Sequence, residues 1–174
     1  NTNINSFEYG IWLAGSSNNS IFENNIIANK WHGIRLYESS NNSISENNIT
    51  ANRAYGVRFH ISSNNSISGN NMTSNQNGIY LSGSSDNSIV ENNVTATRWF
   101  SIWVTDFSNN NIIARNSMVD NYYGMILLDG SSNNAISGNN ITATSYHSIV
   151  FSSSSNNSIV GNTITNNGYG IELD

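Results

Sequence analysis

Hydrophobic and polar residues alternate along this chain in a pattern that returns about every 23 residues. Each copy reads approximately G-I-x-L-x-x-S-S-N-N-S-I-x-x-N-N-I-T-x-N and is followed by a variable turn. The copies begin at Gly10, Gly33, Gly56, Gly78, Ser101, Gly124, Ser148 and Gly170. A period this regular is typical of a solenoid, in which stacked copies of one structural unit form the fold.

Within one copy, the apolar residues fall at alternate positions of short segments. In the first copy these are Ile11 and Leu13, then Ile21, then Ile26 and Ala28. Alternation of this kind, bounded by Asn, Ser and Gly, predicts strands rather than helices. Each strand can pair only with its equivalent in the next copy, which makes the pairing parallel with coils about 4.8 Å apart. Parallel crossovers are overwhelmingly right-handed. The sequence therefore predicts an all-β fold, a right-handed parallel β-helix of about seven coils of 22–24 residues with three short strands per coil.

Asparagines recur at two positions of each coil. The first column comprises Asn25, Asn48, Asn71, Asn93, Asn116 and Asn140, with Thr163 in the last coil. We expect it to face inward as a structural ladder, because stacked amides can hydrogen-bond along the rod. The second column comprises Asn19, Asn42, Asn65, Asn87, Asn110, Asn134 and Asn157. We expect it to mark another bend, since Asn tolerates the left-handed backbone of tight bends.

The run N-S-I-x-x-N-N-I-T-x-N…G-I-x-L resembles the repeats of right-handed parallel β-helix proteins of the carbohydrate-binding and sugar-hydrolase type. These belong to the pectate-lyase-like superfamily, and the chain is similar in particular to the NosD-like surface proteins. The resemblance covers the whole chain and implies the fold. It does not select an activity, because such repeats serve lyases, hydrolases, epimerases, adhesins and structural stalks. We expect an extracellular or cell-surface location.

The composition narrows the partners. The chain has 174 residues, 37% of them hydrophobic, which suits one domain over residues 1–174 with the narrow core of a rod. Net charge is −5 with six basic residues, so we expect no nucleic-acid partner, and no apolar run is long enough for membrane insertion. Without cysteine there are no disulfides or thiolate metal sites. The last residues begin an eighth coil, so we expect a segment of a longer solenoid or surface protein, or ends that self-associate with other copies.

Aromatic and basic residues concentrate on one side of the predicted rod. Two positions after each coil start, the outward column holds Trp12, Arg35, Arg58, Tyr80, Trp103, Ile126, Val150 and Glu172. More aromatic residues lie just before the starts. Aromatic faces can stack on sugar rings while guanidinium groups bind hydroxyls or carboxylates. The predicted glycan-binding residues are Trp31, Arg35, Arg58, Tyr80, Trp99, Trp103 and Tyr123. The same residues could instead shield the turn beneath them or pack against another part of a larger chain.

Two carboxylates form a candidate catalytic or metal pair. Asp106 and Asp129 occupy the same outward position in adjacent coils, so their Cα atoms should lie near 5 Å apart. Such a pair could divide acid and base roles in glycoside hydrolysis or bind calcium. Arg58 and His60 are the nearest candidate bases, two coils or roughly 10 Å from Asp106. No cofactor other than calcium is expected, and no Ser–His–Asp arrangement is expected.

Eight Asn-x-Ser/Thr motifs occur in the repeat. Asn48, Asn71, Asn93 and Asn140 are expected to be unreachable in the inward ladder. The glycosylation candidates are therefore Asn18, Asn41, Asn64 and Asn156, which we expect on an exposed bend.

Three functions follow from these features. The first is a rigid extracellular scaffold that presents a glycan-binding or adhesive face. The second is a polysaccharide lyase or glycoside hydrolase that uses Asp106 and Asp129. The third is a self-assembling rod whose ends stack into filaments.

Overall fold

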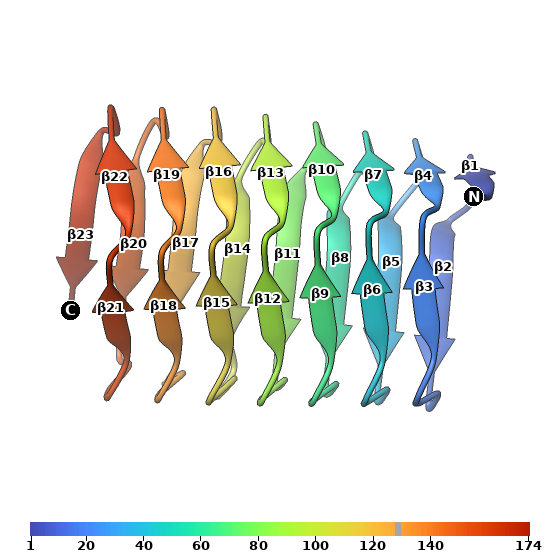
Figure 1. Ribbon diagram of the computed structural model, residues 1–174, viewed down its shortest axis with the longest axis horizontal. Coiled ribbons are helices and arrows are strands. Elements are labelled where there is room, and N and C mark those ends of the chain that lie inside the picture. The colour runs from blue at the N-terminus through green and yellow to red at the C-terminus, as the bar shows by residue number, and fades with distance from the viewer. Residues whose placement is uncertain (128–129) are drawn as a thin grey trace.

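The computed structural model describes residues 1–127 and 130–174, which consist of short strands joined by bends. The strands form three parallel sheets that run along a rod, with the chain ends at opposite ends of it (Figure 1). One sheet, the long-strand sheet, takes the longest strand of each coil. Its strands are β2 (Tyr9–Ala14), β5 (His32–Tyr37), β8 (Tyr55–His60), β11 (Asn77–Ser82), β14 (Phe100–Thr105), β17 (Tyr123–Leu127), β20 (His147–Phe151) and β23 (Tyr169–Leu173). The predicted all-β parallel solenoid is confirmed.

The other two sheets are built from strands of three residues. The serine sheet contains β3 (Ser20–Phe22), β6 (Ser43–Ser45), β9 (Ser66–Ser68), β12 (Ser88–Val90), β15 (Ile112–Ala114), β18 (Ala135–Ser137) and β21 (Ser158–Val160). The Asn/Thr sheet contains β1 (Asn3–Asn5), β4 (Asn25–Ile27), β7 (Asn48–Thr50), β10 (Asn71–Thr73), β13 (Asn93–Thr95), β16 (Ser117–Val119), β19 (Asn140–Thr142) and β22 (Thr163–Thr165). None of the described segments forms a helix with the length and apolarity needed to cross a membrane.

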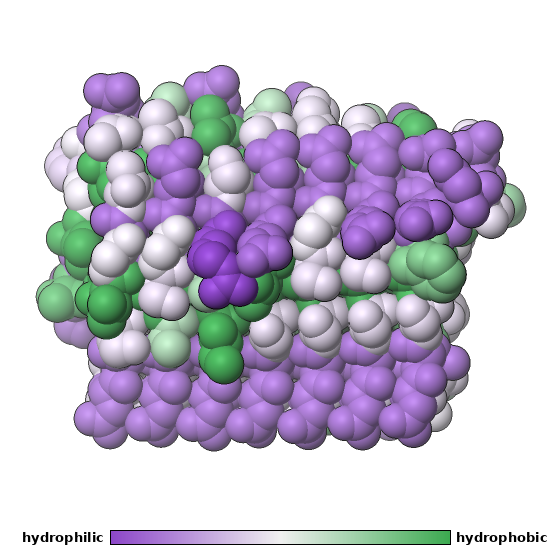
Figure 2. Space-filling view, viewed as in Figure 1, coloured by the Kyte–Doolittle hydropathy of each residue, from purple (hydrophilic) through white to green (hydrophobic). Residues whose placement is uncertain are grey.

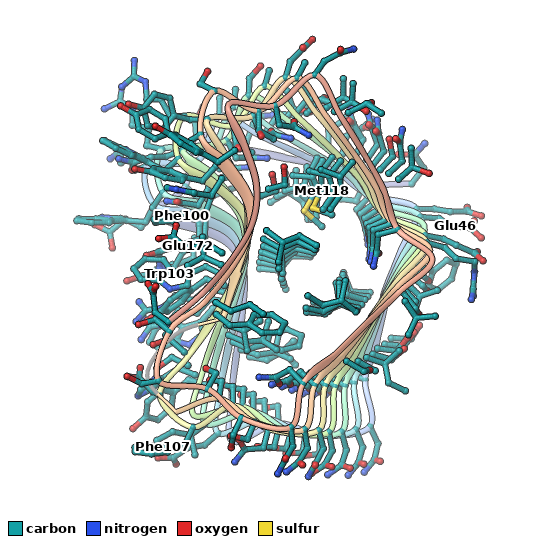
Figure 3. The ribbon with its side chains drawn as sticks, turned by 90° about the vertical axis from the view of Figure 1, so that its left-hand side faces the viewer. Glu46, Phe100, Trp103, Phe107, Met118 and Glu172 are labelled. Carbon is teal, nitrogen blue, oxygen red and sulfur yellow. The ribbon has the colours of Figure 1, made fainter. Side chains whose placement is uncertain are left out.

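The core is a set of stacked apolar side chains, one or two from each strand. In the second coil these are Ile34 and Leu36 from β5, Ile44 from β6 and Ile49 from β7, all fully buried. Equivalent residues pair in register between coils, so like side chains lie above one another (Figure 3). Each such burial contributes about 1.5–3 kcal/mol. Ala28, which the alternation places with Ile26, turns outward instead, because it adopts a left-handed bend with φ 55°.

Buried asparagine ladders close the bends. Asn70, between the serine and Asn/Thr sheets, shows the pattern. Its Nδ2 donates to the carbonyl oxygens of Ile44 and Ser68 at 2.9 and 3.1 Å and to Asn92 Oδ1 at 3.0 Å. Its Oδ1 accepts from the backbone N–H of Asn47 at 3.0 Å. The amides thus satisfy backbone groups that a bend would otherwise bury unpaired.

The predicted asparagine ladder is wrong by one residue. Asn25, Asn48, Asn71, Asn93 and Asn140 lie on the outer face of the Asn/Thr sheet, partly or fully exposed, where the first four hydrogen-bond to one another. The inward ladder of this bend is Asn24, Asn47, Asn70, Asn92, Asn116, Asn139 and Asn162. The alternation allows either member of each Asn–Asn pair to face inward, and the hydrogen bonds of the bend select the first.

An extra residue at the bend after β14 explains the remaining shifts of register. Asp106 and Phe107 both have positive φ, 54° and 57°, where the bends directly after β2, β5, β8 and β11 have one such residue each, namely Gly15, Glu38, Ile61 and Gly83. The buried ladder of the bend between the long-strand and serine sheets therefore runs from Asn87 to Asn111 rather than to Asn110. For the same reason Asn93 pairs with Ser117, and Asn116 falls into the inward ladder.

Candidate functional site

The outward residues of the long-strand sheet form one column in register. Trp12 pairs with Arg35, Arg35 with Arg58, Arg58 with Tyr80, and Tyr80 with Trp103. The backbone register continues through Ile126, and the column resumes with Val150 and Glu172. Viewed along the rod, Phe100, Trp103 and Glu172 point outward on the same side, while Met118 points into the core (Figure 3). Strand alternation therefore places an aromatic and cationic strip on one face of the molecule.

A continuous track of aromatic rings follows this strip along the rod. Adjacent rings lie 4.5–5.4 Å apart, centroid to centroid, from Tyr9 through His32, Tyr55, Tyr80, Trp103 and Phe100 to Tyr123. Tyr123 contacts Tyr146 and His147, and His147 stacks on Tyr169 at 4.6 Å. Each coil contributes at least one ring, and all of these rings except the buried His32 lie at the surface along the rod axis.

Two arginines are set into the first half of the track. The Arg35 guanidinium lies 5.3 Å from the Tyr9 ring centre and 5.2 Å from that of Trp12. The Arg58 guanidinium lies 5.8 and 5.7 Å from the ring centres of Tyr55 and Tyr80. These are cation–π distances. Both arginines remain partly exposed.

His32 is buried beneath the two arginines. Burial, followed by the charges of Arg58 and Arg35, lowers the pKa of His32 to about 4. The ring is therefore neutral at pH 7, and its Nε2 faces the Arg58 NH1 at 3.5 Å. Within the described part of the chain, its Nδ1 is buried without a hydrogen-bond partner, as are Arg35 Nε, Arg58 Nε and Trp103 Nε1.

The structure brings most of the predicted glycan-contact residues together. Arg35, Arg58, Tyr80 and Trp103 share the outward column, and Tyr123 belongs to the ring track. Trp31 and Trp99 lie on the bend that precedes β5 and β14, with 56% and 45% of their surface exposed. The sequence prediction missed Tyr9, Tyr37 and Phe100 as contacts, although their fixed offsets from the coil starts mark them as outward. The role of these residues in binding stays a prediction.

A hydrogen-bonded chain joins three polar residues beside the strip. Ser82 Oγ donates to Asp106 Oδ2 at 2.5 Å and lies 3.2 Å from His60 Nδ1. Because the Ser82 proton is committed to Asp106, its oxygen can only accept from His60 Nδ1–H. In that tautomer of the imidazole the lone pair lies on Nε2. Tyr37 stacks on the His60 ring at 5.6 Å.

The residues His60, Ser82 and Asp106 do not form the nucleophilic triad considered from the sequence. The three residues meet because one residue from each of three successive coils reaches the same end of the long-strand sheet. Their order differs from that of a nucleophilic triad, since Ser82 lies in the middle and donates to the carboxylate. The extra residue at Asp106 and Phe107 re-aims the bend, as bulges do, and leaves Phe107 71% exposed (Figure 3).

Metal binding by the predicted pair is not tested. Asp129 lies outside the described residues, so the expected spacing between Asp106 and Asp129 stays a prediction. Over residues 1–127 and 130–174 no group of three or more His, Cys, Asp or Glu side chains has the arrangement of a metal site.

The other faces of the rod are polar and more uniform. Figure 2 shows unbroken rows of hydrophilic side chains along the bend below the serine sheet and further hydrophilic side chains over much of the Asn/Thr sheet, with paler side chains between them. The glycosylation candidates Asn18, Asn41, Asn64 and Asn156 are exposed at bends with φ between 55° and 62°. The expectation that Asn48, Asn71, Asn93 and Asn140 are unreachable is wrong, because these residues face outward. A shallow hollow of about 660 Å³ is lined by residues 18–20, 41–43, 64–66, 86 and 88. Its buried asparagines already hydrogen-bond to one another, so it leaves few groups for a ligand.

A comparison of the sequence with known protein families agrees with the observed fold. The family described as right handed beta helix region matches residues 1–141 and 101–174, so the chain belongs to this family. This confirms the predicted right-handed parallel β-helix. Among curated proteins, no sequence relative matches the chain.

Solved structures share the architecture at low identity. The chain is similar to a DFA-IIIase from Arthrobacter chlorophenolicus A6 without its lid, at 15% identity and a TM-score of 0.85, over 97% of this chain and 48% of that one. The same enzyme in complex with GF2 gives 14% identity and a TM-score of 0.82, over 99% and 51% of the two chains. A double mutant of the periplasmic alginate epimerase AlgG gives 21% identity and a TM-score of 0.73, over 91% and 44%. The chain therefore spans about half the length of these proteins, and the likeness shows the fold alone.

Proposed function

We propose that this chain is part of an extracellular β-helix scaffold whose long-strand sheet binds an extended glycan on its outer face. The observation that carries the proposal is the continuous ring track from Tyr9 to Tyr169 with arginines set into it. A polymer laid along the rod would meet an aromatic ring or an arginine at each coil, and stacking on a sugar ring needs only a flat apolar face. Similar folds in DFA-IIIase and alginate epimerase, whose names refer to carbohydrates, are consistent with this function.

Trp103 is the residue that best tests glycan binding along the ring track. It lies at the centre of the track, in contact with both Tyr80 and Phe100, and is partly exposed. Trp103→Ala should weaken glycan binding by about 2 kcal/mol, roughly 30-fold, which is the size typical of an aromatic hot spot. Phe22→Ala is the matched control, because Phe22 is an aromatic residue that is 56% exposed on the serine sheet.

The measurement is a binding screen against a panel of neutral and acidic oligosaccharides, followed by titration calorimetry on the best ligand. Wild type and Phe22→Ala should bind equally and Trp103→Ala weakly. Equal affinities for all three proteins would overturn the proposal, as would a screen in which no glycan binds.

A glycan-cleaving enzyme is the second candidate, and the His60–Ser82–Asp106 chain is the observation that favours it. The exposed Asp106 carboxylate and the His60 Nε2 lone pair flank a surface on which a sugar could be positioned for acid and base steps. The same panel tests this candidate when it is scored for shortened products, with calcium and with a chelator. Cleavage that is lost in Asp106→Asn and kept in Asp86→Asn, a second exposed bend aspartate, would establish it.

A further inference from the structure

Arg35 and Arg58 lie side by side, and no described side chain forms an ion pair with either of them. They pair in register on β5 and β8, which places their Cα atoms about 4.8 Å apart. Among the described residues the ion pairs are Arg115 with Glu91 and His147 with Glu172, and neither includes these arginines. Guanidinium groups stay charged at any pH that a folded protein meets, so the two positive charges repel each other across neighbouring strands.

The residues around the two arginines cannot neutralise them. Their neighbours are the rings of Tyr9, Trp12, Tyr37, Tyr55 and Tyr80, which attract cations but carry no charge. His32, the titratable group between them, is buried, and its Nε2 faces Arg58 rather than an acid. The acids nearest in the chain, Glu8 and Glu38, are exposed and form no ion pair with either arginine within the described part of the chain.

Arg35 and Arg58 lie on the strip, whereas many of the acidic side chains lie at bends. Glu23, Glu46 and Glu91 lie at the bend between the serine and Asn/Thr sheets. With a net charge of −5, the molecule as a whole repels polyanions. An anionic ligand would therefore be attracted locally, by specific groups, rather than by the general field of the protein.

We propose that Arg35 and Arg58 bind the anionic group of an acidic glycan, either the carboxylate of a uronic acid residue or a sulfate ester. This inference rests on the proposed glycan binding along the ring track and specifies the chemical class of the glycan. The planar guanidinium fork matches a carboxylate or sulfate through paired N–H donors. The flanking tyrosine and tryptophan rings provide the stacking surface for the sugar that carries the anion. One negative group between the two arginines would remove the repulsion that the free protein retains.

Calorimetric titration with three pairs of ligands tests the anion site. The pairs are hexagalacturonate with its carboxyl-reduced galactose counterpart, a sulfated dextran fragment with unsulfated dextran, and monomeric galacturonate with galactose. The expected result is at least tenfold tighter binding of the charged member of one polymeric pair, with an affinity that falls as salt rises. The pair that shows it identifies carboxylate or sulfate as the source of the anion.

Substitutions locate the effect. Arg58→Gln should weaken binding of the charged ligand at least tenfold more than it weakens binding of the neutral counterpart. Arg53→Gln is the matched control, because Arg53 is an exposed arginine on the bend before β8. Equal binding of charged and neutral ligands, or equal losses in the two variants, would overturn the anion site.

Failure of the anion site is distinguishable from failure of glycan binding along the ring track. If neutral and charged polymers bind with equal affinity and Trp103→Ala weakens both, glycan binding along the track is supported and the anion site is rejected. If galacturonate but not galactose changes the NMR chemical shifts of the His32 ring, and no polymer binds, the anion site is supported and glycan binding along the track is rejected. No binding of any ligand and no displaced signal would reject both.

Discussion

Two columns of side chains run along this rod at the same coil spacing, one inside a bend and one on the outer face of the long-strand sheet. The inner column is asparagine in all seven coils, from Asn24 to Asn162. The outer column changes from coil to coil and includes tryptophan, arginine, tyrosine and glutamate. Both columns pair in register, so the stacking geometry allows uniformity in either.

The difference between the two columns shows which positions of the repeat require one particular residue type. An inner asparagine must satisfy two backbone carbonyls of the bend and also its neighbours above and below, and no other side chain offers the same donors and acceptor at that length. An outer residue meets solvent, so packing leaves its identity open. Variation at an outer position within an otherwise uniform repeat is therefore where specificity for a ligand can be placed.

The largest effect is expected from breaking the inner column. Asn70→Ala removes the acceptor of the Asn47 N–H and the donor to the Ile44 and Ser68 carbonyls. Unsatisfied buried groups cost about 1–3 kcal/mol each, so the free energy of unfolding should fall by roughly 4 kcal/mol. Urea denaturation measures it. The matched control is Asn71→Ala, one residue later and exposed, where the loss should stay below about 1 kcal/mol. Equal losses of unfolding free energy in the two variants would show that the inner and outer asparagine columns contribute equally to stability.

A smaller effect is expected where the outer strip covers a buried residue. The pKa of His32 is lower in the folded protein, about 4, than its ordinary value of 6.5. Between these pH values the unfolded chain binds more protons, so stability is full above pH 6.5 and falls as pH drops toward 4. The loss should reach about 3 kcal/mol. His32→Gln should flatten this part of the pH dependence of the urea midpoint. Parallel curves for the two proteins, or a His32 ring that titrates near pH 6.5 by NMR, would contradict it.

The sequence predicted the coil, the three strands and the outward column, because these depend only on the period of two and on the 23-residue repeat. It did not predict which member of each Asn–Asn pair faces inward. Asn70 and Asn71 differ only in the hydrogen bonds that the bend provides, and the partners in these bonds can be identified only from the three-dimensional structure. The His60–Ser82–Asp106 chain was also hidden, because an inserted residue at Asp106 and Phe107 sets the direction of the Asp106 side chain.

The smallest effect is expected at an outward column in which threonine recurs between Ile27 and Val119. Thr50, Thr73 and Thr95 lie in register on the Asn/Thr sheet, and the Oγ1 atoms of Thr73 and Thr95 are 3.3 Å apart. If threonine recurs here because it suits an exposed strand, Thr73→Val should change stability by no more than about 0.5 kcal/mol, while Thr73→Gly should cost about 1 kcal/mol. Neither variant should alter glycan binding. A loss above about 2 kcal/mol in Thr73→Val would mean that the hydroxyl file, like the buried amides, holds the coils together. A residue type that recurs from coil to coil would then indicate a structural role on the outer face as well as on the inner one.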